Sequence, residues 1–232
     1  MILAGHQPEH LPYPGFFYKM LKADKFILVD HIQFEKKNFQ NRNKIQIKNE
    51  PHFLWLTVPV LTKGKRFQKI NEVEINNELP WAENHWKAIS LTYKNAPFFE
   101  EHSKFFEELY KKKWTKLVDL NIEIIKYIAK QLEIEKNILI SSDFKFEKSK
   151  DELLVEMCQK LDADTYLSGK GGKAYVSENL FEENNLNHVF SDFELKEYRQ
   201  RFKPFVPNLS IIDLLFNHGK KEVKKMLLNF HE

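Results

Sequence analysis

The sequence has little cysteine, little glycine and no long apolar run. Of its 232 residues, one is cysteine and seven are glycine. The single cysteine, Cys158, cannot form an internal disulfide, so we expect a reducing compartment, the cytoplasm. Its neighbours have the apolar spacing of a helix, which predicts a buried, unreactive thiol rather than a catalytic nucleophile.

Membrane and nucleic-acid roles are also disfavoured. A spanning helix needs roughly 18 or more consecutive apolar residues, and no such stretch is present. The first residues carry neither a basic segment nor a small-residue cleavage site, so a signal peptide is not expected. The 36 Lys and Arg nearly balance the 33 Asp and Glu, which argues against a nucleic-acid binder. A small, phosphate-containing substrate held in a local basic pocket remains compatible with this balance.

Hydrophobic residues make up 42% of the chain, and 20 of them are phenylalanine, which is enough for a substantial aromatic core. Five short apolar runs are separated by helical patterns, as expected for parallel strands joined by crossover helices. The runs cover residues 1–4, 25–30, 137–141, 164–168 and 187–191, and the helical patterns cover residues 16–21, 149–161 and 175–183. We therefore predict an α/β fold with a Rossmann-like parallel sheet, in which ligands bind beyond the carboxyl ends of the strands.

A different residue pattern lies between the second and third apolar runs. Residues 43–48 and 53–58 alternate polar and apolar side chains around a turn at residues 49–51, which predicts a β-hairpin. Helices are predicted at residues 81–93, 97–111 and 115–132. We interpret residues 1–232 as a single α/β domain with a helical and β-hairpin cap inserted at about 40–132. Near the end, Ser210 should begin a helix that Gly219 stops, before a last helix at residues 222–229.

The first candidate site is the loop after the first strand, Gly5-His6-Gln7-Pro8-Glu9-His10. His6 is a candidate general base or phosphate contact, and Gln7 and His10 are candidate substrate-binding residues. Two histidines before a helix are also found in nucleotidylyltransferases and related adenylate-forming enzymes, although the spacing and the prolines here differ. The alternative is a turn whose polar side chains make structural hydrogen bonds.

The second candidate is the loop after the second strand. Asp30, at the strand end, is a candidate catalytic residue as a general base or hydroxyl acceptor. Gln40 and Asn41 are candidates for orienting an acceptor, and Arg42 can bind a phosphate or carboxylate through two hydrogen bonds. If the first two strands are neighbours, this loop should lie beside His6. The alternative is a solvated basic loop.

The third candidate is a glycine-rich stretch between a predicted strand and helix. Such a loop exposes backbone N–H groups to an anion, and the helix N-terminus adds a favourable potential. The spacing is neither that of a Walker A loop nor that of a dinucleotide fingerprint, and a plain turn is the alternative. The candidate phosphate-binding residues are Ser168, Gly169, Lys170, Gly171, Gly172 and Tyr175.

The other polar residues carry weaker signals. His85 lies between two tryptophans on a predicted helix and is more typical of a packed histidine than of a ligand. Asp213, in an apolar helix, should either pair with a buried Lys or Arg or face the site. The histidines and Cys158 show no metal-ligand spacing, so no metal site is predicted.

Several separate motifs, in order along almost the whole chain, resemble the WbqC-like protein family. They include His6-Gln7-Pro8, Gly15-Phe16-Phe17, Gln40-Asn41-Arg42-Asn43, Trp55-Leu56-Thr57-Val58-Pro59, Tyr166-Leu167-Ser168-Gly169 and Leu209-Ser210-Ile211-Ile212-Asp213. The resemblance implies a link to bacterial surface-polysaccharide gene clusters and the attachment of an amino acid, such as glycine, to an amino sugar. It supplies no established catalytic residue. Glu9-His10 departs from the neutral pair expected there, which weakens a catalytic role for His10.

Three functions are compatible with these observations. The first is a transferase or ligase that attaches an amino acid or acyl group to a nucleotide-linked amino sugar in O-antigen or related polysaccharide biosynthesis. The second is an adenylate-forming or nucleotidylyl-transferring enzyme that binds ATP. The third is a non-catalytic ligand-binding or scaffold protein of polysaccharide assembly. A homo-oligomer is compatible with each of them.

Overall fold

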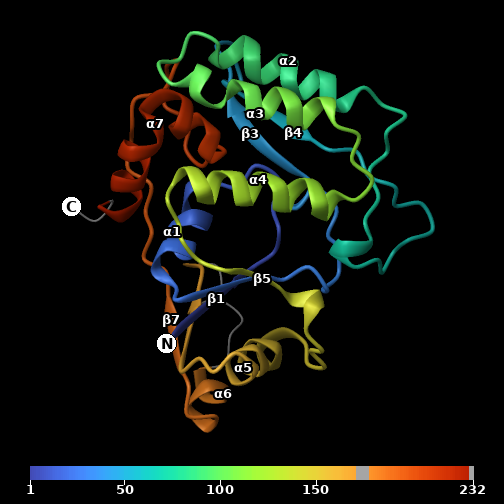
Figure 1. The fold of residues 1–232 in the computed structure, drawn as a ribbon, viewed down its shortest axis with the longest axis vertical. Helices are drawn as coiled ribbons and strands as arrows, with labels where there is room; N and C mark the ends of the chain where they lie inside the picture. The colour runs from blue at the N-terminus through green and yellow to red at the C-terminus, as the bar shows by residue number, and fades with distance from the viewer. Residues whose placement is uncertain (171–177, 230–232) are drawn as a thin grey trace.

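A computed structural model describes residues 1–170 and 178–229, and it has a mixed α/β fold (Figure 1). The main sheet is parallel throughout and has five strands. In spatial order these are β5 (Ile138–Ile140), β2 (Lys25–Leu28), β1 (Ile2–His6), β6 (Thr165–Ser168) and β7 (Asn187–Phe190). The predicted parallel sheet is thus confirmed, and each strand lies within the apolar run that indicated it or extends it by two residues.

The order of these strands fixes where a ligand should bind. The chain runs from β1 outward to β2 and β5, and then returns to place β6 on the other side of β1. Numbered along the chain, the sheet strands lie in the order 3-2-1-4-5, which is the Rossmann order. The switch point lies between β1 and β6, where Leu3 is in register with Tyr166. In open α/β sheets, the crevice outside the carboxyl ends of the strands at this point is the preferred ligand site.

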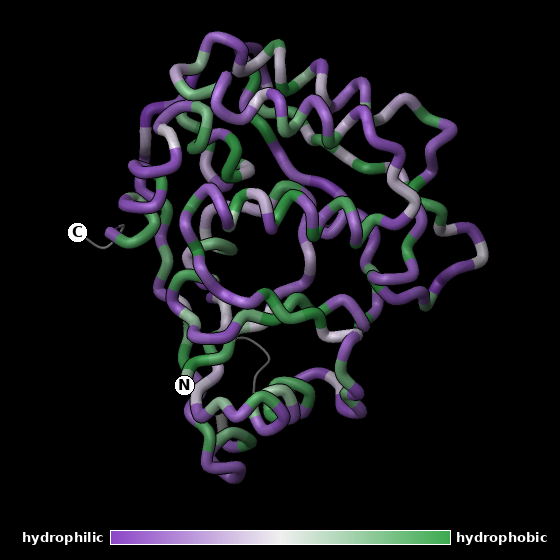
Figure 2. Tube along the Cα trace, in the orientation of Figure 1, coloured by the Kyte–Doolittle hydropathy of each residue, from purple (hydrophilic) through white to green (hydrophobic). Residues whose placement is uncertain are grey.

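Successive side chains of the strands point alternately into two separate hydrophobic cores, one on each face of the sheet. Ala4 and Phe26 point into the larger core with helix α1 (Pro14–Lys22) and helix α4 (Leu117–Gln131). Leu3 and Ile27 point into the smaller core with helix α5 (Lys150–Lys160) and helix α6 (Glu178–Glu183). Figure 1 shows these helix pairs on opposite sides of the sheet, and Figure 2 shows hydrophobic strands at the centre with hydrophilic outer turns.

The segment between β2 and β5 contains the predicted hairpin and helices. Strands β3 (Arg42–Gln46) and β4 (Phe53–Thr57) form a separate antiparallel sheet, followed by a short 3-10 helix, η1 (Ile70–Glu72). Helix α2 (Trp81–Tyr93) has the predicted bounds, and α3 (Phe99–Lys111) begins slightly late. Helix α4 begins at Leu117 rather than at 115, because Thr115 and Lys116 pair with the extended residues 74–75. Side chains of this segment share the larger core with the sheet.

Helix α7 (Ile211–Leu228) begins at the predicted cap, where the Ser210 hydroxyl accepts a hydrogen bond from the Ile212 N–H. Gly219 interrupts it with φ 73° and ψ 160°, so the predicted break is confirmed. A Cβ atom at this position would lie 2.7 Å from the ring of Phe98. Only glycine satisfies both the positive φ and this close approach. No helix within residues 1–170 and 178–229 has the length and apolar character needed to cross a membrane.

Candidate functional site

A cavity of about 590 Å³ lies at the switch point of the sheet. It is bordered by the end of β1 and the following loop, by α1, and by the segments that follow β6 and β7. Most of the lining residues are polar or basic, and the others are two glycines, two aromatic residues and a leucine. The lining residues are Gly5, His6, Gln7, Lys19, Gly169, Lys170, Ser191, Asn208, Tyr13, Phe193 and Leu195. The first and third candidate loops therefore meet where the fold predicts a ligand.

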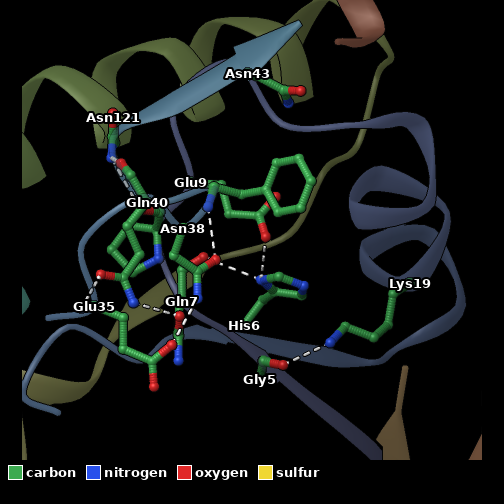
Figure 3. A network of polar contacts seen from close by, with 12 residues as sticks. Gly5, His6, Gln7, Glu9, Lys19, Glu35, Asn38, Gln40, Asn43 and Asn121 are labelled. Carbon is green, nitrogen blue, oxygen red and sulfur yellow. Dashed lines mark hydrogen bonds and ion pairs between the residues drawn. The ribbon is translucent and has the colours of Figure 1, made fainter. Parts of the chain in front are cut away.

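Lys19 is the buried cation of this cavity. Its side chain lies on α1 and is only 5% exposed, and its ammonium donates to the carbonyl oxygen of Gly5 at 2.7 Å (Figure 3). Burial lowers the pKa of Lys19 to about 8, although the nearby Glu9 carboxyl opposes this shift. Gly5 is the one hydrogen-bond acceptor that Lys19 has among the residues that the structure describes. Two of the three ammonium protons are therefore left for a ligand.

Glu9 lies next to Lys19 and is the second buried ionisable group beside the cavity. Burial raises the pKa of the Glu9 carboxyl to about 8, with Lys19 opposing the shift. One carboxyl oxygen, Oε2, is buried and has no partner among the described residues. Near neutral pH, Glu9 thus keeps a proton for most of the time while Lys19 remains charged. The site then carries a net positive charge, which suits an anionic ligand.

His6 presents one ring nitrogen to the cavity. Its Nδ1 atom lies 3.1 Å from the carbonyl oxygen of Gln7 and 3.8 Å from Oε1 of Glu9. Because a carbonyl oxygen can only accept, we assign the proton to Nδ1, which leaves the lone pair on Nε2. Burial and the charge of Lys19 lower the pKa of His6 to about 3, so the ring is neutral. His6 can therefore accept a hydrogen bond from a ligand.

An amide relay, formed by the side chains of Gln7, Gln40 and Asn121, holds the loop after β1 in place (Figure 3). The Gln40 side chain is completely buried and donates from Nε2 to Oε1 of Gln7 at 2.6 Å. Its own Oε1 accepts from the backbone N–H of Glu35 at 3.0 Å. Asn121 of α4 donates to the backbone oxygens of Gln40 and Pro8, at 2.7 and 2.9 Å. These bonds fix the Gln7 carboxamide at the edge of the cavity.

Comparison with known proteins identifies the family. The model of the WbqC-like protein family matches residues 7–225, which is nearly the whole chain. The chain belongs to the WbqC-like protein family. It is 34% identical over 215 residues to the uncharacterized protein Rv1507c of Mycobacterium tuberculosis, and the match covers 92% of each chain. No solved structure matches it.

In this WbqC-like protein, the loop after β2 lies beside the His6 loop as expected, since the His10 N–H donates to the backbone oxygen of Phe39 at 2.9 Å. Asp30 itself is not among the residues that line the cavity, and its catalytic role stays a prediction. The Asp30 carboxylate is 2% exposed and accepts from the hydroxyls of Ser141 and Ser142, at 2.9 and 2.8 Å. It also accepts from the backbone N–H of Ser142 at 2.9 Å. These bonds tie the end of β2 to the short 3-10 helix η2 (Ser141–Asp143), which follows β5.

Arg42, Asn41 and His10 also lie outside the cavity. The Arg42 guanidinium stacks 4.2 Å from the ring of Trp55 in the hairpin. The Asn41 side chain donates to the backbone oxygen of Val58 at 3.0 Å. His10 is fully buried, with Nδ1 at 3.3 Å from Oδ1 of Asn121. None of these three residues lines the cavity, and their roles in substrate binding stay predictions.

The glycine-rich stretch lies only partly within the described residues. Gly169 and Lys170 line the cavity, whereas the Ser168 hydroxyl lies beside it at 2.8 Å from Nε2 of His188. Gly171, Gly172 and Tyr175 lie outside the residues that the structure describes. A Cβ atom on Gly169 would have no neighbour within 4 Å among the residues that the structure describes.

Several site residues were not predicted from the sequence. Lys19 had a signal, because it is the one charge in the apolar helical stretch Phe16-Phe17-Tyr18-Lys19-Met20. No sequence pattern indicated the other residues, since they come from loops without a repeating pattern: Tyr13, Ser191, Phe193 and Asn208. Within the described part of the chain, no group of three or more His, Cys, Asp or Glu side chains could hold a metal ion.

Proposed function

We propose that this WbqC-like protein is a transferase that attaches an amino acid or acyl group, such as glycine, to a nucleotide-linked amino sugar in surface-polysaccharide biosynthesis. The observation that carries the proposal is the cavity at the switch point, where the buried Lys19 ammonium has a single hydrogen-bond acceptor among the described residues. A nucleotide-linked sugar carries phosphate groups that match this charge. The resemblance to the family supports the polysaccharide context and the type of group transferred.

In this proposal, different lining residues contact different parts of the substrate. Lys19 and the backbone near Gly169 bind phosphate, and the rings of Tyr13 and Phe193 pack against the nucleoside or the sugar. His6 accepts a hydrogen bond from the sugar amine and orients the nitrogen lone pair towards the activated carbonyl carbon. A carbon–nitrogen bond forms, and the carbon–oxygen bond between the acyl group and the phosphate or AMP that activates it breaks. That phosphate or AMP leaves with the bonding electron pair, and the amine loses one proton. A bound phosphate raises the pKa of His6, which enables His6 to receive that proton.

Replacing His6 by alanine is expected to abolish product formation while leaving the binding of a nucleotide sugar nearly unchanged. The ring accepts from the reacting amine, whereas Lys19 holds the phosphate. The full-length protein would be incubated with a UDP-linked amino sugar, glycine and ATP, and the glycyl-sugar product detected by mass spectrometry. His218→Ala is the matched control, because His218 does not line the cavity. Wild-type product yield from His6→Ala, or pyrophosphate release without a glycyl-sugar, would count against the proposal; the latter favours the adenylate-forming function.

Replacing Gly169 by valine is expected to block the cavity without harming the fold. The new Cβ has no neighbour within 4 Å in the described part of the chain, and Gly169 does not have a positive φ, so the substitution causes no backbone strain. The branched side chain occupies the volume next to Lys170 that the phosphate needs. We expect the affinity for UDP-N-acetylglucosamine to fall by at least about tenfold, with a melting temperature within a few degrees of wild type. Isothermal titration calorimetry and thermal unfolding measure the two effects; unchanged affinity places the ligand elsewhere.

A further inference from the structure

A second cavity, of about 560 Å³, lies between the loop after β2 and the loop after β4. Residues 33–36 form one side, and residues from Thr62 to Gln68 form the other. The two loops are joined by an isolated β-bridge between Gln33 and Lys69, and the Phe34 N–H donates to the backbone oxygen of Gln68 at 2.9 Å. The second candidate loop of the sequence thus borders this cavity instead of the one at the switch point.

One side chain, that of Gln40, is hydrogen-bonded to a lining residue of each cavity. Gln7 lines the switch-point cavity, and Glu35 lines the second one. Gln40 lies between them and is hydrogen-bonded to both, through Nε2 to Gln7 and through Oε1 to the Glu35 N–H. Because Gln40 is completely buried and bonded at both ends, ligands in the two cavities would lie at opposite ends of the same relay.

The second cavity offers cations beside hydrogen-bond acceptors. No carboxylate among the described residues forms a salt bridge with Lys36 or Arg66, whereas Lys65 is paired with Glu74 at 2.8 Å. The Gln68 side chain is 8% exposed and donates from Nε2 to the backbone oxygen of Leu61 at 3.3 Å. This bond fixes its amide, and Oε1 is buried without a partner among the described residues. Such an acceptor needs a donor, and an amine or hydroxyl supplies one.

We propose that this second cavity is a separate ligand site, for a small molecule with an anionic group close to an amine. Arg66 and Lys36 hold the anionic group, and the amine donates to Gln68 and to the Glu35 carboxylate. A free amino acid and a phosphorylated amino sugar share this chemistry.

Calorimetric titration of the full-length protein tests the inference, with glycine and glucosamine 1-phosphate as separate probes. The double variant Lys36→Glu/Arg66→Glu is expected to bind the preferred probe at least about tenfold more weakly than wild type. The control, Lys37→Glu/Lys63→Glu, makes the same change in charge at exposed positions that do not line the cavity, and it should keep wild-type affinity. The probe that binds identifies the source of the anionic group. Failure of both probes to bind wild type, or equal weakening in both double variants, overturns the inference.

The same titrations separate this inference from the proposed function. UDP-N-acetylglucosamine is expected to bind Lys36→Glu/Arg66→Glu with nearly wild-type affinity, because its phosphates lie at Lys19. If the nucleotide sugar does not bind wild type, the switch-point proposal fails. The response of glycine or glucosamine 1-phosphate to the two double variants still decides whether the second cavity is a site.

Discussion

Replacing Lys19 by methionine is expected to weaken the binding of UDP-N-acetylglucosamine by roughly 10- to 150-fold. A hydrogen bond from a charged group contributes about 1.5–3 kcal/mol, and Lys19 has two ammonium protons for the phosphates. Methionine has a similar length and fills the same buried space, so the helix should keep its packing. The Gly5 carbonyl loses its donor, which costs stability of about 1–3 kcal/mol. Calorimetry at neutral pH measures the affinity.

Lys22→Met is the matched control for this experiment. Lys22 lies on the same helix, is exposed, and does not line the cavity. Its replacement removes the same charge from the protein, so the long-range attraction of an anion falls equally in both variants. We expect the affinity of Lys22→Met to stay close to that of wild type. Equal affinities for Lys19→Met and Lys22→Met would show that no phosphate reaches Lys19.

The pH dependence of binding should have a definite sign. The pKa of Lys19 is lowered to about 8, so the ammonium loses its proton as the pH rises through that value. The pKa of Glu9 is raised to about 8, so a negative charge develops over the same interval. Both changes disfavour an anion. Wild-type affinity should therefore be highest below about pH 7 and fall steadily above about pH 8, while Lys19→Met shows a shallower decline.

The fold was predictable because its signals are local. Short apolar runs ending in polar residues, with helical patterns between them, identified all five strands of the sheet. The turn at residues 49–51 marked the hairpin, and Gly219 marked the break in α7. The position of His6 at a ligand-binding edge followed from the end of β1 alone. These features depend on the spacing of neighbouring residues, and a single sequence contains that spacing.

The composition of the site was harder to predict, because it depends on which strand lies beside which. Asp30 does follow a strand at the carboxyl edge, but β2 is one strand away from the switch point, and its end faces the serines after β5. Arg42 belongs to the separate antiparallel hairpin, so its position is not set by the parallel sheet. Asn208 reaches the cavity from more than two hundred residues away along the chain. A strand-end rule identifies the correct edge but not the neighbours along it.

A second prediction concerns the most deeply buried carboxylate. Asp213 on α7 is completely buried. It pairs with no Lys or Arg in residues 1–170 and 178–229 and lines no part of the switch-point cavity, contrary to both expectations from the sequence. Its two oxygens accept from the hydroxyl of Tyr93 at 2.7 Å and from that of Tyr198 at 2.9 Å. Tyr93 also accepts from the backbone N–H of Gln46 at 3.3 Å. The network thereby joins α7, α2, the hairpin and the segment after β7.

Asp213→Ala is expected to lower the free energy of unfolding by about 3–5 kcal/mol. The change leaves two buried phenol hydroxyls without acceptors, each costing about 1–3 kcal/mol, and it creates a small cavity. Asp213→Asn is the matched control, because the amide accepts from one tyrosine and donates to the other. Its cost at pH values below 5 should stay within about 1 kcal/mol. Urea unfolding of both variants measures these differences, and a small effect of alanine would mean that the network contributes little.

The same carboxylate should make the stability depend on pH. Burial raises the pKa of Asp213 from the ordinary 3.8 to about 6, although the bonds from Tyr93 and Tyr198 oppose the shift. The folded state therefore binds the proton more tightly than the unfolded chain does. Its contribution to stability is complete below the unfolded pKa and is lost as the pH rises through about 6, by up to about 3 kcal/mol. Asp213→Asn cannot titrate, so it should lose this slope and become more stable than wild type near about pH 8. An equal slope in both proteins would assign the titration to a different group.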